Sequence, residues 1–173
     1  MAKESIEILN TKIDVQALLK ELNSALAEEW LAFYQYWIGA QVVVGFNRPE
    51  VEAEFNEHAM EEFGHAKKLA NRIKELDGTP VLTPKEWSEI AICKYIEPRN
   101  FDVISLLKDN IAGERCAIAH YQKIAEMTEG KDYVTATLVK EILAEEEQHE
   151  LDLSDYLDDI NNALETIKNY INK

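Results

Sequence analysis

The sequence is poor in cysteine and in the residues that interrupt helices. It has six glycines, four prolines and two cysteines in 173 residues. Cys93 and Cys116 lie 23 residues apart and form no CxxC pair, which argues against a zinc site and against the disulfide framework of a small secreted protein. No run of about 18 apolar residues is present, and residues 1–10 lack the apolar centre of a signal peptide. We therefore expect a cytoplasmic chain that does not enter a membrane.

The sequence is also poor in positively charged residues. Lysine and arginine total 18 against 33 aspartates and glutamates, which gives a formal net charge of −15. Because binding to nucleic acids and to anionic lipids depends mainly on lysine and arginine, we expect neither as a direct partner. A strongly acidic chain is compatible with cationic ligands, metal ions among them. The length and the 46% apolar fraction fit one domain over residues 1–173 with a sizeable core.

The few prolines divide the chain into long windows that predict helices. They stand at positions 49, 80, 84 and 98. We expect long helices over about 14–45, 49–76 and 102–128 and from 132 to beyond 159, with a short helix over about 84–93. Tight turns would make two antiparallel hairpins, and the connection of about 20 residues between them is long enough to cross a bundle. The prediction is an all-α, antiparallel four-helix bundle over about 14–165 with a long crossover that contains a short helix.

Polar residues interrupt the apolar seam of every long helix. A bundle core is apolar at 3-4 spacing, yet a glutamate stands on each of the four seams and a histidine follows on two of them. The six residues are Glu29, Glu62, His65, Glu114, Glu146 and His149. Four buried carboxylates at one level would repel one another strongly unless cations neutralised them. Two divalent ions would balance the four charges, and two imidazoles would complete the coordination.

The spacing of these residues repeats between the two halves of the chain. Glu29 precedes Glu62 by 33 residues and Glu114 precedes Glu146 by 32, and a histidine follows each second glutamate three residues later. One glutamate from each of two helices plus Glu-x-x-His from each of the other two is the di-iron carboxylate arrangement. We predict that the six residues bind two iron ions per chain and carry the catalytic chemistry, with manganese or zinc as alternative metals.

Two alternatives to this assignment stay open. The helix register leaves neighbouring glutamates as substitutes, namely Glu28 for Glu29 and Glu145 or Glu147 for Glu146. The apolar seam and the histidine at plus three favour Glu29 and Glu146. The other alternative is an acidic helical scaffold without catalysis, which predicts no stoichiometric metal binding.

At these motifs the chain resembles the ferritin-like superfamily. The stretch from Leu22 through Glu29 to Tyr36 is similar to the first helix of bacterioferritins, and Glu62-Phe63-Gly64-His65 and Glu146-Glu147-Gln148-His149 are similar to their two Glu-x-x-His segments. The resemblance covers about residues 14–160 and is strongest to the Dps-like proteins, also called thioferritins. It implies a ferritin-like bundle and a hollow twelve-subunit shell. Such a shell oxidises Fe(II), preferably with hydrogen peroxide rather than dioxygen, stores ferric mineral and protects against oxidative stress.

The thioferritin resemblance gives the cysteines a role. Its mark is a cysteine pair beside the metal centre, one on the crossover and one just after the glutamate of the third long helix, here Cys93 and Cys116. The resemblance implies redox thiols, and a reversible disulfide would require a close approach. Taken alone, Cys116 also fits a small buried apolar residue that neighbours the ligands. The methionine that binds haem in bacterioferritins is replaced by Phe63, so no haem is expected.

Two further residues are candidates for supporting the centre. Tyr36 lies two turns past Glu29 and matches a family position from which it would hydrogen-bond a ligand carboxylate. His58 lies one turn before Glu62, either as a supporting group, as a ligand near the bundle end, or as an ordinary core histidine. The alternative function is a rubrerythrin-like di-iron peroxidase without mineral storage. The chain lacks the iron–sulfur module of rubrerythrins, but its two cysteines could supply reductant.

Overall fold

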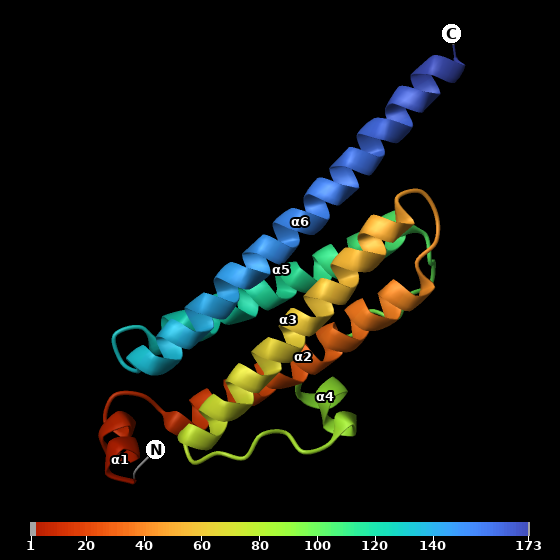
Figure 1. Ribbon diagram of the computed structural model, residues 1–173. Coiled ribbons are helices and arrows are strands. Elements are labelled where there is room, and N and C mark those ends of the chain that lie inside the picture. Colours follow the sequence, from red (N-terminus) through yellow and green to blue (C-terminus); the bar gives the residue numbers. More distant parts are fainter. Residues whose placement is uncertain (1–2, 173) are drawn as a thin grey trace.

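The computed structural model describes residues 3–172, which form six α-helices and no β-strand (Figure 1). The helices are α1 Lys3–Asn10, α2 Val15–Val42, α3 Arg48–Glu75, α4 Pro84–Ile90, α5 Val103–Thr128 and α6 Tyr133–Ile171. The all-α prediction is confirmed, and the four long helices and the short crossover helix lie close to their expected ranges. Helix α1 has no counterpart among the predicted elements, because eight residues are too few to show a helical period. None of the described helices combines the length and hydropathy of a membrane span.

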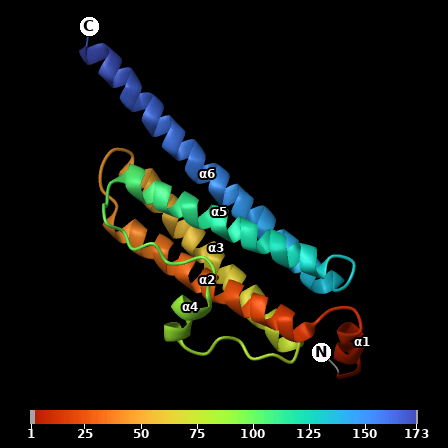
Figure 2. The same cartoon turned by 180° about the vertical axis from the view of Figure 1, so that it is seen from behind.

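Two helical hairpins pack together to form the bundle (Figures 1 and 2). Helices α2 and α3 make the first hairpin, and α5 and α6 make the second. Left-handed backbone closes both turns, with φ values of 117° at Gly45, 63° at Asn47 and 69° at Gly130. Helix α6 has 39 residues against 26 in α5, so its C-terminal end extends past the bundle (Figure 1).

Three of the long helices begin at an aspartate that caps free backbone N–H groups. Asp14 accepts from Gln16 N and Ala17 N at the start of α2. Asp102 accepts from the backbone N–H of residue 105 at the start of α5, and Asp132 accepts from that of residue 135 at the start of α6. Each cap supplies an acceptor that the first turn of a helix otherwise lacks, which fixes where the helix begins.

The crossover between the hairpins runs beside α2 and is fastened along its length (Figure 2). Helix α4 begins with a capping box between Thr83 and Glu86. Ser24 Oγ on α2 donates to the Ile90 carbonyl at the end of α4, over 2.9 Å. A disulfide between Cys93 and Cys116, with Cα atoms 5.7 Å apart, then joins the crossover to α5. The crossover is therefore held against the middle of the bundle.

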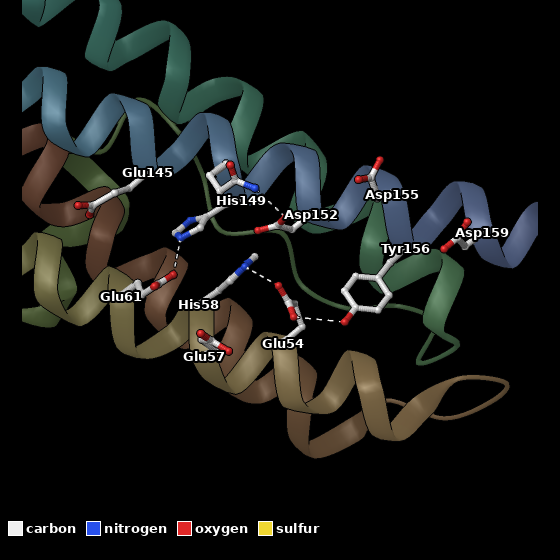
Figure 3. A pocket seen from close by; sticks show the side chains of 11 residues that line it. Glu54, Glu57, His58, Glu61, Glu145, His149, Asp152, Asp155, Tyr156 and Asp159 are labelled. Carbon is white, nitrogen blue, oxygen red and sulfur yellow. Dashed lines mark hydrogen bonds and ion pairs between the residues drawn. The ribbon is translucent and has the colours of Figure 1, made fainter.

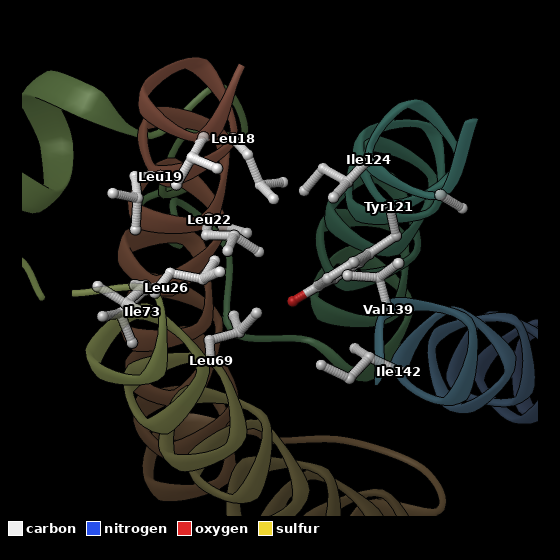
Figure 4. Close-up of a cluster of buried hydrophobic side chains, with 14 of the residues drawn as sticks. Leu18, Leu19, Leu22, Leu26, Leu69, Ile73, Tyr121, Ile124, Val139 and Ile142 are labelled. Carbon is white, nitrogen blue, oxygen red and sulfur yellow. The ribbon is translucent and has the colours of Figure 1, made fainter. Parts of the chain in front are cut away.

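The apolar core is divided into two clusters with a polar layer between them. One cluster fills the end where α2 begins and α3 ends, and Figure 4 shows its side chains directed inward from all four long helices. It includes Leu18, Leu22, Leu69, Ile73, Ile124, Val139 and Ile142. The other cluster fills the opposite end and includes Val51, Phe55, Leu107, Leu153 and Ile160. On every long helix the predicted metal ligands lie between the two clusters, so the core itself holds them in place.

A buried ion pair locks the two hairpins together at one end. Arg72 on α3 donates from Nη2 to Asp132, which precedes α6, at 2.9 and 3.0 Å, and from Nε to Thr135 Oγ1 at 2.7 Å. Arg72 and Asp132 are 3% and 4% exposed. Burial favours the neutral carboxyl, but the hydrogen bonds from Thr135 and Arg72 outweigh it and lower the pKa of Asp132. The pair therefore remains charged inside the protein.

Candidate metal centre

The six predicted ligands meet in the middle of the bundle, and each is at most 3% exposed. They come from all four long helices: Glu29 from α2, Glu62 and His65 from α3, Glu114 from α5, and Glu146 and His149 from α6. Of the alternative glutamates, Glu147 is exposed and Glu28 binds the backbone of the crossover. Glu145 contacts the outer nitrogen of His65, Nε2, and belongs to neither ligand group. The structure thus brings together the residues that the apolar seams single out.

The ligand atoms form two overlapping groups, each compact enough to hold a metal ion. One group contains Glu29, Glu62, His65 and Glu146, and the other contains Glu62, Glu114, Glu146 and His149. Within each group the ligand atoms all lie within 4.8 Å of one another. Glu62 and Glu146 belong to both groups, so their carboxylates are placed to bridge two ions. Oxygen and imidazole donors of this kind suit divalent iron, manganese or zinc.

Both histidines turn Nδ1 toward the shared carboxylates. His65 Nδ1 lies 3.1 Å from Glu62 Oε2 and 3.0 Å from Glu146 Oε1. His149 Nδ1 lies 3.3 Å from Glu62 Oε1 and 3.4 Å from Glu146 Oε2. These short separations join the Glu-x-x-His motif of α3 to that of α6. A neutral imidazole in this orientation would present the Nδ1 lone pair to a metal.

Two outer glutamates orient the histidines, a role that the sequence motifs alone do not predict. Glu145 lies 2.5 Å from His65 Nε2, and Glu61 lies 2.7 Å from His149 Nε2. Each is the residue just before a ligand glutamate, and each contacts the histidine of the opposite motif. A carboxylate that accepts the Nε2 proton fixes the tautomer and leaves Nδ1 for the metal. In the sequence, the signal for this role is a second glutamate directly before the first residue of each Glu-x-x-His motif.

Several ligand atoms are buried without a hydrogen-bond partner among the described residues. They are Glu29 Oε2, Glu62 Oε1, Glu146 Oε1 and His149 Nδ1. A buried polar atom without a partner costs free energy, because it has given up its hydrogen bonds to water. These unpartnered atoms all belong to residues of the two ligand groups, and each has a lone pair to offer to a metal. The residues therefore fit a pair of cations.

Repulsion among the buried carboxylates changes their pKa values. Burial, followed by repulsion from Glu146 and Glu62, raises the pKa of Glu29 well above its usual range. The same causes in the same order raise the pKa of Glu114. Burial also opposes ionisation of Glu62, but the two adjacent histidines outweigh it and lower its pKa. Without a cation, protons thus neutralise part of the charge.

The histidines carry the rest of this neutralising charge. Burial alone would lower the pKa of His65, but the surrounding glutamate carboxylates raise it far above the usual value. For His149 the same balance raises the pKa to about 12. Since a metal binds deprotonated imidazole and carboxylate, ion binding at the centre displaces these protons.

Two tyrosines hold the unshared glutamates, each reaching from the opposite hairpin. Tyr36 on α2 donates to Glu114 on α5, and Tyr121 on α5 donates to Glu29 on α2. Burial and the nearby carboxylates raise both tyrosine pKa values well above the usual range, so both hydroxyls remain donors. From the sequence, either tyrosine could take this role and Tyr36 is preferred; in the structure both take it.

We expect the double substitution Tyr36→Phe and Tyr121→Phe to weaken metal binding by about tenfold or more, because partners of ligand residues usually contribute about 10- to 100-fold. Zn²⁺ titration against a competing chelator measures the effect. The control, Tyr34→Phe with Tyr133→Phe, removes two hydroxyls from exposed tyrosines. Equal affinities in the two double variants would contradict a role for the buried hydroxyls.

The disulfide borders the centre through Glu28. This buried glutamate accepts from Ile92 N at 2.7 Å and Cys93 N at 3.2 Å, and its other oxygen lies 2.7 Å from His120 Nδ1. A narrow cavity of about 40 Å³ has both Cys93 and ligand glutamates among its lining residues. That space accommodates a molecule the size of water. The cysteine pair predicted from the sequence therefore lies beside the metal groups.

His58 occupies a separate position at the edge of the centre. Its ring stacks on His149 with centroids 4.1 Å apart and meets the Tyr36 ring edge-on at 5.2 Å. Its Nε2 lies 3.1 Å from Glu54 rather than near one of the six ligands' carboxylates. Burial and the neighbouring His149 lower the pKa of His58 to about 4. The imidazole is thus neutral at pH 7.

Comparison with known proteins gives consistent matches. A family model described as a ferritin-like domain matches residues 19–163, which include both hairpins' ligand residues. The DNA protection during starvation protein of Pyrococcus furiosus is 33% identical over 142 residues, covering 81% of this chain and 76% of that protein. The bacterioferritin of Brucella melitensis is 31% identical over 133 residues, covering 76% of this chain and 77% of the relative.

Solved structures extend the match to the whole bundle. A dodecameric thioferritin, the bacterioferritin-related protein from Bacteroides fragilis, superposes with a TM-score of 0.94 at 57% identity, covering 95% of this chain and 98% of that one. Dps from Thermosynechococcus elongatus superposes with a TM-score of 0.78 at 24% identity, covering 82% and 90% of the two chains. The second likeness is one of fold alone.

Proposed function

The chain belongs to the ferritin-like family, and on that premise we propose that it oxidises Fe(II) and stores the Fe(III) product inside a shell of twelve identical chains. The observation that carries the proposal is the pair of overlapping ligand groups that share Glu62 and Glu146. A site for two ions side by side suits a two-electron oxidant, since each Fe(II) gives up one electron.

The chemistry assigned to the centre balances with hydrogen peroxide as the oxidant. Two Fe(II), one H₂O₂ and two protons give two Fe(III) and two water molecules. The four glutamates neutralise the incoming charge, and the shared carboxylates keep the two substrate ions adjacent. Because both electrons reach the same peroxide molecule, no hydroxyl radical is released. Dioxygen is the alternative oxidant.

Assembly into a shell is supported by the Bacteroides fragilis protein, which is described as dodecameric, and by apolar side chains on the surface of this chain. Tyr34 and Trp37 on α2 are 46% and 43% exposed, and Ile167, Tyr170 and Ile171 are exposed near the end of α6. Contact with further copies would cover such residues.

The Pyrococcus furiosus relative is named for DNA protection. With a net charge of −15, we propose that this chain would protect DNA by consuming iron and peroxide rather than by coating it.

The position of Phe63 bears on haem. Its side chain is 43% exposed and packs against the rings of Trp30 and Phe33. A phenyl ring offers no ligand atom to haem iron. We therefore propose that iron at the centre is the metal used, without haem.

A peroxidase that stores no mineral is the second candidate, and the disulfide is the observation that favours it. Two thiols at Cys93 and Cys116 would reduce one H₂O₂ to two water molecules while forming the disulfide. The pair lies beside the ligand groups, so electrons from the thiols would have a short path to oxidised iron. In this reading iron cycles and remains bound.

Iron retention separates the two functions. We expect anaerobic loading with excess Fe(II), followed by peroxide, to leave far more iron in the protein than the two ions of each centre. The measurement is iron per chain after gel filtration, with negative-stain microscopy to show the shell. Retention of about two ions per chain would favour the peroxidase, and no retention would contradict both functions. A parallel reaction in air compares the two oxidants.

A further inference from the structure

An acidic pocket of about 480 Å³ opens between α3 and α6 beside the metal centre (Figure 3). Its lining contains seven carboxylates and no lysine or arginine. His149, a ligand of the centre, and His58 also line it. The pocket therefore borders the centre at His149, and its carboxylates attract cations.

Three side chains in this pocket converge outside the two ligand groups already described. Glu54 and His58 on α3 face Asp152 on α6 (Figure 3). One nitrogen of His58 and one carboxylate oxygen from each acid all lie within 4.8 Å of one another. His58 Nε2 lies 3.1 Å from Glu54 Oε1. None of these three residues belongs to the pair of groups at the centre.

His58 is the buried member of this trio. Its side chain is 3% exposed, and its Nδ1 has no hydrogen-bond partner within residues 3–172. The nitrogen that faces Glu54 is Nε2, so this buried imidazole is positioned to offer a nitrogen to a cation held by the two acids. Its ring stacks on His149 at 4.1 Å, so it stands between the pocket and the centre.

The two carboxylates are only partly satisfied by their neighbours. Tyr156 donates to Glu54 Oε2 at 3.4 Å, and Gln148 donates to Asp152 Oδ1 at 2.8 Å. The second oxygen of Glu54 faces His58 Nε2, and within residues 3–172 the second oxygen of Asp152 has no hydrogen bond. Two like charges this close repel, and the pocket lining supplies no lysine or arginine to balance them.

We propose that Glu54, His58 and Asp152 form a third binding site for a divalent cation, one that holds an incoming ion next to the di-metal centre. Two carboxylates and one imidazole suit Fe(II), Zn²⁺ and Mn²⁺, with water completing the coordination. The role as a holding site for Fe(II) rests on the proposed function; the binding site itself does not. The stacked rings of His58 and His149 place the two sites next to each other.

Zn²⁺, which undergoes no redox change, tests the site in the full-length assembled protein. Crystals of metal-stripped protein soaked in Zn²⁺ are expected to show three anomalous peaks per chain. Two lie within the six-residue centre and one lies between Glu54, His58 and Asp152. The double variant Glu54→Gln with Asp152→Asn is expected to lose the third peak and keep the other two. The matched control, Asp155→Asn with Asp159→Asn, removes two charges from the same pocket and is expected to keep all three.

The outcomes are distinct for the two proposals. Two peaks at the centre and none at the trio in the parent protein would overturn the third site and leave the proposed function standing. A missing pair of peaks at the centre would count against the proposed function instead. For the holding role, the Glu54→Gln, Asp152→Asn variant is expected to need about tenfold more Fe(II) for half-maximal oxidation rate, with the maximal rate unchanged. An unchanged half-saturation would overturn that role.

Discussion

Replacing Glu62 and Glu146 with alanine is expected to abolish stoichiometric metal binding and to reduce Fe(II) oxidation to the rate in buffer. These two carboxylates belong to both ligand groups, so their loss leaves each group with one glutamate and one histidine. Removing partners of metal ligands already costs about 10- to 100-fold, and the loss of bridging ligands should exceed that range. Zn²⁺ titration and stopped-flow oxidation with peroxide measure the two effects.

A matched control carries the same change of charge on the same helices. Glu50→Ala with Glu147→Ala removes one exposed glutamate from α3 and one from α6. The control is expected to behave as the parent does. Circular dichroism checks that the ligand variant folds, since the change removes both carboxylates that repel Glu29 and Glu114 and carboxylates that contact the two histidines. Parental oxidation rates in the folded ligand variant would refute the assignment of the centre.

Asp132→Ala is expected to lower the free energy of unfolding by about 3–5 kcal/mol, since it removes the buried partner of Arg72 and leaves only the exposed carboxylate of Glu75. The measurement is denaturant unfolding at fixed protein concentration, because assembly would add to the apparent stability. The change also removes the N-cap of α6. Arg72→Met with Asp132→Ala is expected to recover much of the loss, because it removes both charges.

Asp132 contributes both an N-cap and an ion pair, and a variant of the α5 cap separates these two contributions. Asp102→Ala removes an N-cap aspartate that has no ion pair with a basic residue within residues 3–172, and it is expected to cost about 1 kcal/mol. The excess loss in Asp132→Ala then measures the buried pair. Because the pKa of Asp132 is lowered in the folded state, its stabilisation is present above the unfolded pKa. It disappears as the pH falls through the folded pKa. Equal costs for the two caps would show that the ion pair contributes nothing.

The sequence predicts the bundle and the positions of the six glutamates and histidines because both depend on helical periodicity. A polar residue on an apolar seam is visible without knowing which helices touch. The crossed contacts are not visible in this way. Glu61 reaches His149, and Tyr121 reaches Glu29, only because particular helices are neighbours at a particular height.

The same limit applies to the crossover and to the ion pair between Arg72 and Asp132. The disulfide follows from how the crossover lies against α2 and α5, which no periodic pattern encodes. Arg72 stands on the seam of α3, where periodicity marks it as unusual for a core. Its partner Asp132 lies 60 residues away in a turn, so only the packed structure identifies the pair.

The division of ligands between the hairpins shapes how the protein can fold. Each ligand group takes three residues from one hairpin and a single glutamate from the other, Glu146 for the first group and Glu62 for the second. Pairing within a hairpin involves contacts nearer in sequence, so it is favoured before the hairpins dock. The chain therefore meets the full repulsion among its core carboxylates only at docking. A cation held by these residues would then cross-link the two halves, so metal binding is expected to slow their separation as well as to stabilise the folded state.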